Sequence, residues 1–242
     1  MWVNVNIGLI MGVLLPPLFY VLLIYFTAPY KTITLKKSLL YFIGGILSIS
    51  FVEMFYAFIS VETTSIFKEC FFNIAPREEI SKLCAFGLIS TIINNKDRHP
   101  VATMYYMGIV GLGFAMLENL HYVFRFGSDV LYTRTFTSTI AHLIFTLFMG
   151  YWVGLSQVDL RKYGNRSIFG VVMYKHKKIR KIIYILIGLI SAISFHGLWN
   201  FNLTQMSPST VPFMILMIIF GLVTSKFATT DLYNHNRKSL KK

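Results

Sequence analysis

Long apolar runs separated by short polar segments make up most of the 242-residue chain. An apolar stretch of about 20 residues can cross a bilayer as a helix, and about seven stretches approach that length. Their expected bounds are Ile7–Phe26, Leu39–Ser60, Pro76–Ile93, Val101–Phe124, Phe136–Gln157, Ile182–Phe201 and Val211–Phe227. The pattern predicts an all-α fold, a polytopic transmembrane helical bundle of about seven spans.

The composition supports this interpretation, because 55% of the residues are hydrophobic. A soluble domain would need a long polar segment, and the chain has none of that length. We therefore expect one membrane-embedded domain over residues 1–242, in a multi-pass protein of the cell membrane. Between the second and third spans, Val61–Ala75 carries three phenylalanines, which fits either a helix lying on the membrane surface or an ordinary loop.

Basic residues are distributed unevenly between the two sides of the predicted bundle. The net charge of +13 does not indicate nucleic acid as a partner, because the lysines and arginines lie in short connections and the tail. Alternate connections place 18 of them on one side and four on the other, and the richest is Val158–Lys181. Since basic loops stay in the cytoplasm, we expect the N-terminus outside and the C-terminus inside.

Polar residues inside apolar spans are costly and usually mark function. The third span opens with Glu78 and Glu79, and Lys82 follows at a helical spacing that allows it to pair with either of them. The fourth span contains Glu118 and Asn119.

The fifth span contains His142, and the sixth contains His196 and Asn200, which share one helix face. At ~1.5 Å per residue, Glu118, His142 and His196 lie roughly 9 to 12 Å below the outer surface. Glu78 and Glu79 open their span at the same side. This common depth predicts that the polar side chains meet in one site.

Each cluster also has a structural explanation. The two glutamates fit a solvated helix N-terminus, where the helix dipole favours them. His142 fits a hydrogen-bonded interior histidine, and His196 with Asn200 fits an interhelical hydrogen-bond pair. The agreement in depth favours a functional site over four unrelated features.

These residues resemble the motifs of the PrsW family of intramembrane proteases, which is itself similar to the CAAX-processing and Abi membrane proteases. The matching stretches are Glu78-Glu79-x-x-Lys82, Gly-x-Gly-Phe114-Ala-x-x-Glu118-Asn119-x-x-Tyr122-Val, Arg134 followed by Ala141-His142-x-x-Phe145-x-x-x-x-Gly150, and His196-Gly-Leu-Trp-Asn200. They span about residues 76–201, the expected motif-bearing core. His121 has no place in this pattern.

The resemblance implies a glutamate of the first motif that activates water, with the histidines and Asn200 binding the substrate carbonyl or oxyanion. It also implies a membrane-anchored protein substrate of the anti-sigma-factor kind, cut at the extracytoplasmic face. We therefore expect a peptidase with Glu78, Glu79, Glu118, His142, His196 and Asn200 as catalytic residues and Lys82 and Asn119 in support.

Three alternatives stay open from the sequence. The spacing matches no standard zinc signature, so a site without metal is preferred, with zinc held by the glutamates and histidines as the alternative. An ion or proton transporter would use the same residues as a relay. A membrane scaffold of peptidase ancestry would bind a partner without cleaving it.

Overall fold

The computed structural model describes residues 7–29, 32–59, 62–93, 99–158, 177–205 and 208–240, which are mostly helical and include no strand. The elements are α1 (Ile7–Thr27), α2 (Leu35–Phe58), α3 (Ile66–Lys68), η2 (Glu69–Ile74), α4 (Ala75–Ile92), α5 (Pro100–Phe126), α6 (Val130–Phe136), α7 (Ser138–Leu155), α9 (Lys177–Gln205) and α10 (Thr210–Leu240). The predicted all-α class is confirmed.

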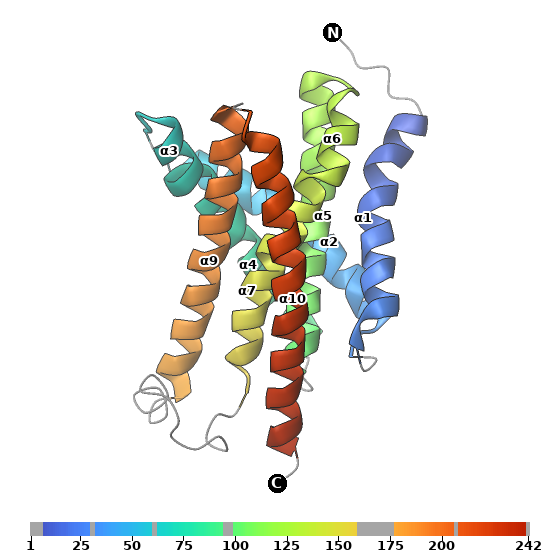
Figure 1. Ribbon diagram of the computed structural model, residues 1–242, viewed down its shortest axis with the longest axis vertical. Helices are drawn as coiled ribbons and strands as arrows, with labels where there is room; N and C mark the ends of the chain where they lie inside the picture. Colours follow the sequence, from blue (N-terminus) through green and yellow to red (C-terminus); the bar gives the residue numbers. More distant parts are fainter. Residues whose placement is uncertain are drawn as a thin grey trace.

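Helix α5 lies inside the bundle, with α1, α7 and α10 beside it, and α9 packs on the far side of α7 (Figure 1). Helix α5 packs against α1, α2, α4, α6, α7 and α10. In its most apolar 18-residue window 89% of residues are buried, compared with 11% in α10. The centre of the bundle is therefore the place where polar side chains can be held away from lipid.

The outer helices present large apolar side chains to their surroundings. Phe19 and Leu22 of α1 and Phe220 and Phe227 of α10 are each more than two-fifths exposed. Among the described residues, six helical segments are long and apolar enough to cross a membrane: α1, α2, α5, α6 together with α7, α9 and α10. With the hydrocarbon of a bilayer around them these surfaces carry no cost, and the chain is an integral membrane protein.

Helix α4, the predicted third span, is not among those six. Its 18 residues include Arg77, Glu78, Glu79 and Lys82, which lower its mean hydropathy, and all four are buried inside the bundle. The number of crossings and the side of each terminus therefore stay predictions. The described chain begins and ends at opposite ends of the long axis (Figure 1).

The last two helices are longer than the apolar runs that predicted them. Helix α9 begins at Lys177 and ends at Gln205, and α10 continues to Leu240, where a basic tail was expected. The residues between the predicted fourth and fifth spans, 125–135, were not expected to be helical, but Val130–Phe136 forms α6. Most of the basic connection Val158–Lys181 lies outside the described residues.

The helix that carries the paired glutamates has a wide turn just before them. The path is helical from Ile66 through α3, η2 and α4. The segment Val61–Ala75 is therefore helical from Ile66 onward, and α4 does not begin afresh at Pro76. In η2 the Ala75 N–H donates to the Cys70 carbonyl, five residues back. Because Pro76 has no N–H and its ring crowds the preceding turn, this π-type widening lets the helix pass through the proline and sets the direction of Glu78 and Glu79.

Candidate active site

Helix α4 contributes an ion pair that is wholly enclosed by protein. Glu79 and Lys82 are both 0% exposed, and Lys82 Nζ donates to Glu79 Oε1 at 2.7 Å. Lys82 Nζ also lies 3.7 Å from Glu78 Oε2, so the predicted pairing with either glutamate is confirmed. Charges buried this deeply are tolerated only when they are paired and hydrogen-bonded.

Helix α9 brings His196 against both glutamates. Its Nδ1–H donates to Glu79 Oε1 at 2.8 Å, and its Nε2 lies 3.7 Å from Glu78 Oε2. The ring stacks on Phe145 of α7, with centroids 5.3 Å apart. The Glu79 carboxylate thus fixes one ring nitrogen and leaves the other facing Glu78.

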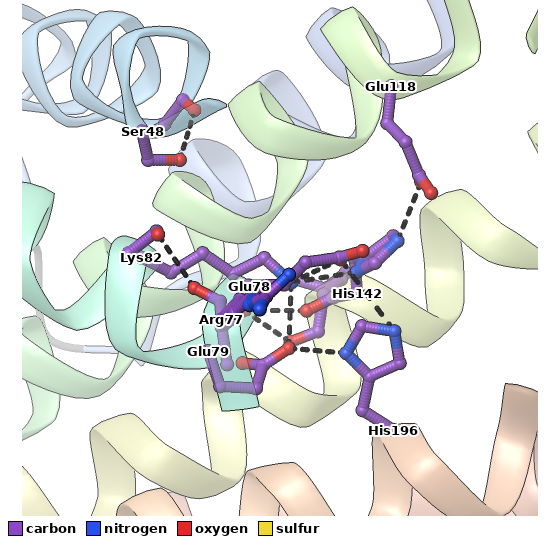
Figure 2. Close-up of polar contacts among 12 residues, drawn as sticks. Ser48, Arg77, Glu78, Glu79, Lys82, Glu118, His142 and His196 are labelled. Carbon is purple, nitrogen blue, oxygen red and sulfur yellow. Dashed lines mark hydrogen bonds and ion pairs between the residues drawn. The ribbon is translucent and has the colours of Figure 1, made fainter. Parts of the chain in front are cut away.

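Helix α7 places His142 at right angles to His196, with ring centroids 5.1 Å apart. His142 Nδ1 is 2.9 Å from Lys82 Nζ. An ammonium group can only donate, so this nitrogen accepts. The other nitrogen, Nε2, carries the proton and donates to Glu118 Oε2 at 2.9 Å. Figure 2 shows these side chains converging from four helices.

Arg134 of α6 completes the network, and the sequence analysis did not count it among the site residues. Its guanidinium donates to Glu118 Oε2 at 2.5 Å and to Asn119 Oδ1 at 2.9 Å, and it covers the Tyr122 ring at 3.5 Å. Asn119 in turn donates to the Thr139 hydroxyl at 2.9 Å. The available signal was the position of Arg134 just ahead of the His142 motif, between the predicted fourth and fifth spans.

Five of the six residues predicted as catalytic are thus linked by direct contacts: Glu78, Glu79, Glu118, His142 and His196. Asn200 is not among them. It lies one turn beyond His196 on α9, is partly exposed, and its side chain makes no hydrogen bond to any described residue. His121 is exposed and stands apart from the cluster.

Glycines bring the helix backbones close at this level. A Cβ on Gly111 of α5 would lie 2.6 Å from the His142 carbonyl oxygen of α7, and one on Gly113 would meet the Phe42 carbonyl of α2. Gly111 and Gly113 therefore let α5 pack closely against α7 and α2. This approach lets Glu118, only two turns further along α5, reach the His142 ring.

Comparison with known protein families gives a match over most of the chain. The family model described as "PrsW family intramembrane metalloprotease" matches residues 34–224. The chain belongs to this family. Membership makes it a membrane peptidase with a protein substrate in the membrane, and it favours that class over a transporter.

Three curated relatives of the PrsW family are similar to this chain. Protease PrsW of Oceanobacillus iheyensis is 28% identical over 196 residues, covering 79% of this chain and 82% of the relative. Protease PrsW of Shouchella clausii is 27% identical over about half of each chain, and that of Bacillus subtilis is 25% identical over a similar share. No solved structure matches this chain.

The family description raises the question of whether these residues fit a metal. Glu78, His142 and His196 each offer a ligand atom, all within 4.8 Å of one another and all buried. Glu78 Oε2 is buried without a hydrogen-bond partner among the described residues, and it faces the unprotonated nitrogen of His196. A carboxylate often accepts the second ring N–H of a metal-binding histidine, and Glu79 and Glu118 occupy those positions. The donor set fits zinc.

Proposed function

We propose that the protein hydrolyses a peptide bond of a membrane-anchored protein, near the extracytoplasmic face of the cell membrane. The observation that carries this proposal is the buried group formed by Glu78, His142 and His196, with a carboxylate on the second nitrogen of each histidine. The proposed substrate class is the anti-sigma-factor kind, which rests on the resemblance to the PrsW motifs alone.

Glu78, His142 and His196 would hold the metal in this proposal. Zinc supplies Lewis acidity, which activates water and polarises a carbonyl. Of the two glutamates, Glu78 is the one with access to water, because its side chain is 11% exposed while that of Glu79 is 0% exposed. If Glu78 binds the metal through Oε2, the buried oxygen without a partner, its other oxygen, Oε1, is our candidate for accepting a proton from the attacking water. Glu79 and Glu118 hold the two histidine rings in place.

Asn200 is assigned to the substrate. Its amide lies one helical turn from His196, and because it is free of other described side chains it is available to a peptide carbonyl. A donor aimed at the developing oxyanion is typically worth about 100- to 1000-fold in turnover. This role keeps the sequence-based prediction for Asn200 while separating it from the metal-binding residues.

A second mechanism for the same reaction is hydrolysis without metal, which the sequence analysis preferred. One contact favours it: Lys82 Nζ occupies the accepting nitrogen of His142. In that mechanism Glu78 would deprotonate water and His196 would donate to the oxyanion. The family description and the three converging donors lead us to place the zinc mechanism first.

Co-expression with candidate single-span proteins tests the proposal. Glu78→Gln keeps the size of the side chain and removes its charge, and Glu53→Gln is the matched control at an exposed glutamate of α2. We expect wild type and the control to release the same substrate fragment and Glu78→Gln to release none. A fragment produced equally by Glu78→Gln would contradict the proposal.

A further inference from the structure

Lys82 occupies the point at which a metal would bind His142. Its Nζ lies 2.9 Å from His142 Nδ1, the one nitrogen of that ring not already held by Glu118. It also lies 2.7 Å from Glu79 Oε1 and 3.7 Å from Glu78 Oε2. Figure 2 shows the lysine side chain ending among these groups.

A zinc ion and the ammonium group cannot share this nitrogen. Zinc binds imidazole nitrogen at about 2.0–2.1 Å. Directed along the same lone pair, an ion at that distance would lie within about 1 Å of the present Nζ position. Two cations at that separation repel strongly and overlap sterically. His142 therefore binds either Lys82 or a metal.

We propose that the Lys82 ammonium occupies the metal position when no metal is bound, and that metal binding requires this ammonium to move away from His142 Nδ1. This inference rests on the proposed zinc site. An alternative position for the ammonium lies nearby, because it can keep its bond to Glu79 and stay near the Phe114 ring, whose centroid is 4.1 Å away. Its flexible four-carbon stem allows this short retreat.

In both histidines the nitrogen that would bind a metal is already unprotonated. His142 carries its proton on Nε2 toward Glu118, and His196 carries its proton on Nδ1 toward Glu79. Displacing Lys82 thus demands no exchange of ring protons. The lysine keeps the buried carboxylates neutralised while the site is empty and weakens the binding of zinc as a consequence.

The test is the zinc affinity of the purified full-length protein in detergent, measured by competition with a chromophoric chelator. Lys82→Met removes the competing cation and keeps the apolar stem, and Lys36→Met is the control at an exposed lysine of α2. We expect Lys82→Met to bind one zinc about 10-fold or more tightly than wild type, because a nearby positive charge is removed and a ligand is freed. Lys36→Met should match wild type.

Lys82→Met leaves Glu79 buried without its main partner, which can destabilise the fold. A second comparison avoids this difficulty: the double variant Lys82→Met/Glu79→Gln against Glu79→Gln alone should show the same gain in affinity. Equal or weaker zinc binding in the folded lysine variants, with wild type binding one zinc that His196→Ala loses, would overturn the inference and leave the proposed site intact. Absence of zinc binding in wild type and in every Lys82 variant would overturn both.

Discussion

At the scale of single residues, the two histidines lie on different helices but make the same kind of contact: each donates one ring N–H to a glutamate. His142 Nε2 donates to Glu118 and His196 Nδ1 donates to Glu79, so each ring has one nitrogen fixed and one directed at the centre of the cluster. Carboxylates in this position orient metal-binding histidines and raise their basicity. The orientation of His142 depends in turn on Arg134, which holds Glu118.

Arg134→Gln should weaken zinc binding. Without the guanidinium, Glu118 loses its strongest partner and holds the His142 ring less firmly, and loss of such outer contacts typically costs about 10- to 100-fold in metal affinity. The measurement is zinc affinity in detergent. The control is Arg125→Gln, at an exposed arginine of α5. Equal affinity in the two variants would show that Arg134 has only a structural role.

Substitutions of Asn200 and of His196 should differ in their effect on zinc binding. Asn200→Ala should lower the cleavage rate by about 100- to 1000-fold and leave zinc stoichiometry unchanged, because its side chain lies outside the network. His196→Ala should lose both zinc and cleavage. Cleavage rates and bound metal are measured on the same preparations, and full activity of Asn200→Ala would remove it from the site.

Much of the site could be predicted from sequence because charged residues in apolar helices are conspicuous and helix geometry gives their depth. Glu78, Glu118, His142 and His196 were identified in this way. The contact of Lys82 with His142, 60 residues away, depends on how α4 packs against α7, which no local pattern encodes. Arg134 was missed because a seven-residue helix has too few apolar positions to stand out from a loop.

At the scale of elements, close packing around α5 sets the position of the site. Gly45 of α2 and Gly113 of α5 face each other so closely that an added Cβ on either would meet the opposite backbone. Helix ends were the weakest part of the prediction, because α9 and α10 continue through polar residues that an apolar pattern excludes. The hydrogen bonds of a helix can continue through polar residues beyond the end of its apolar run.

Gly113→Ala should destabilise the protein. The new methyl group would collide with the Phe42 carbonyl and approach Gly45 Cα at 3.1 Å, and overpacking of this kind costs about 1–3 kcal/mol. The matched control is Gly87→Ala in α4, where an added Cβ has nothing within 4 Å. It should be neutral or stabilising by up to about 1 kcal/mol. Thermal unfolding in detergent compares them, and equal melting temperatures would contradict the packing described.

At the scale of the whole molecule, the charged helix α4 is surrounded by apolar ones. Its four charged side chains are buried, while α1 and α10 are largely open to lipid. The bundle thereby holds a polar site that a bilayer alone would not tolerate. Sequence hydropathy predicted this class of fold and the position of α4 to within one residue at each end. Whether α4 crosses the membrane stays a prediction, because its four charged residues make it less apolar than the other long helices.

The orientation of the bundle is testable with reporter fusions. The distribution of basic residues, 18 against four, predicts that a fusion after Arg166 reports the cytoplasm and one after Ser207 the outside. Both positions lie outside the described residues and are chosen from the sequence. A cytoplasmic signal after Ser207 would contradict the orientation and the proposed extracytoplasmic cleavage.

The central claim, that Glu78, His142 and His196 hold a zinc ion for peptide hydrolysis, is tested most directly by removing and restoring the metal. Purified protein would be stripped with a strong chelator, assayed on a membrane-anchored substrate, and assayed again after addition of one equivalent of zinc. We predict that cleavage is lost on stripping and returns in wild type but not in His196→Ala. Undiminished cleavage by protein whose zinc has been removed would contradict the claim.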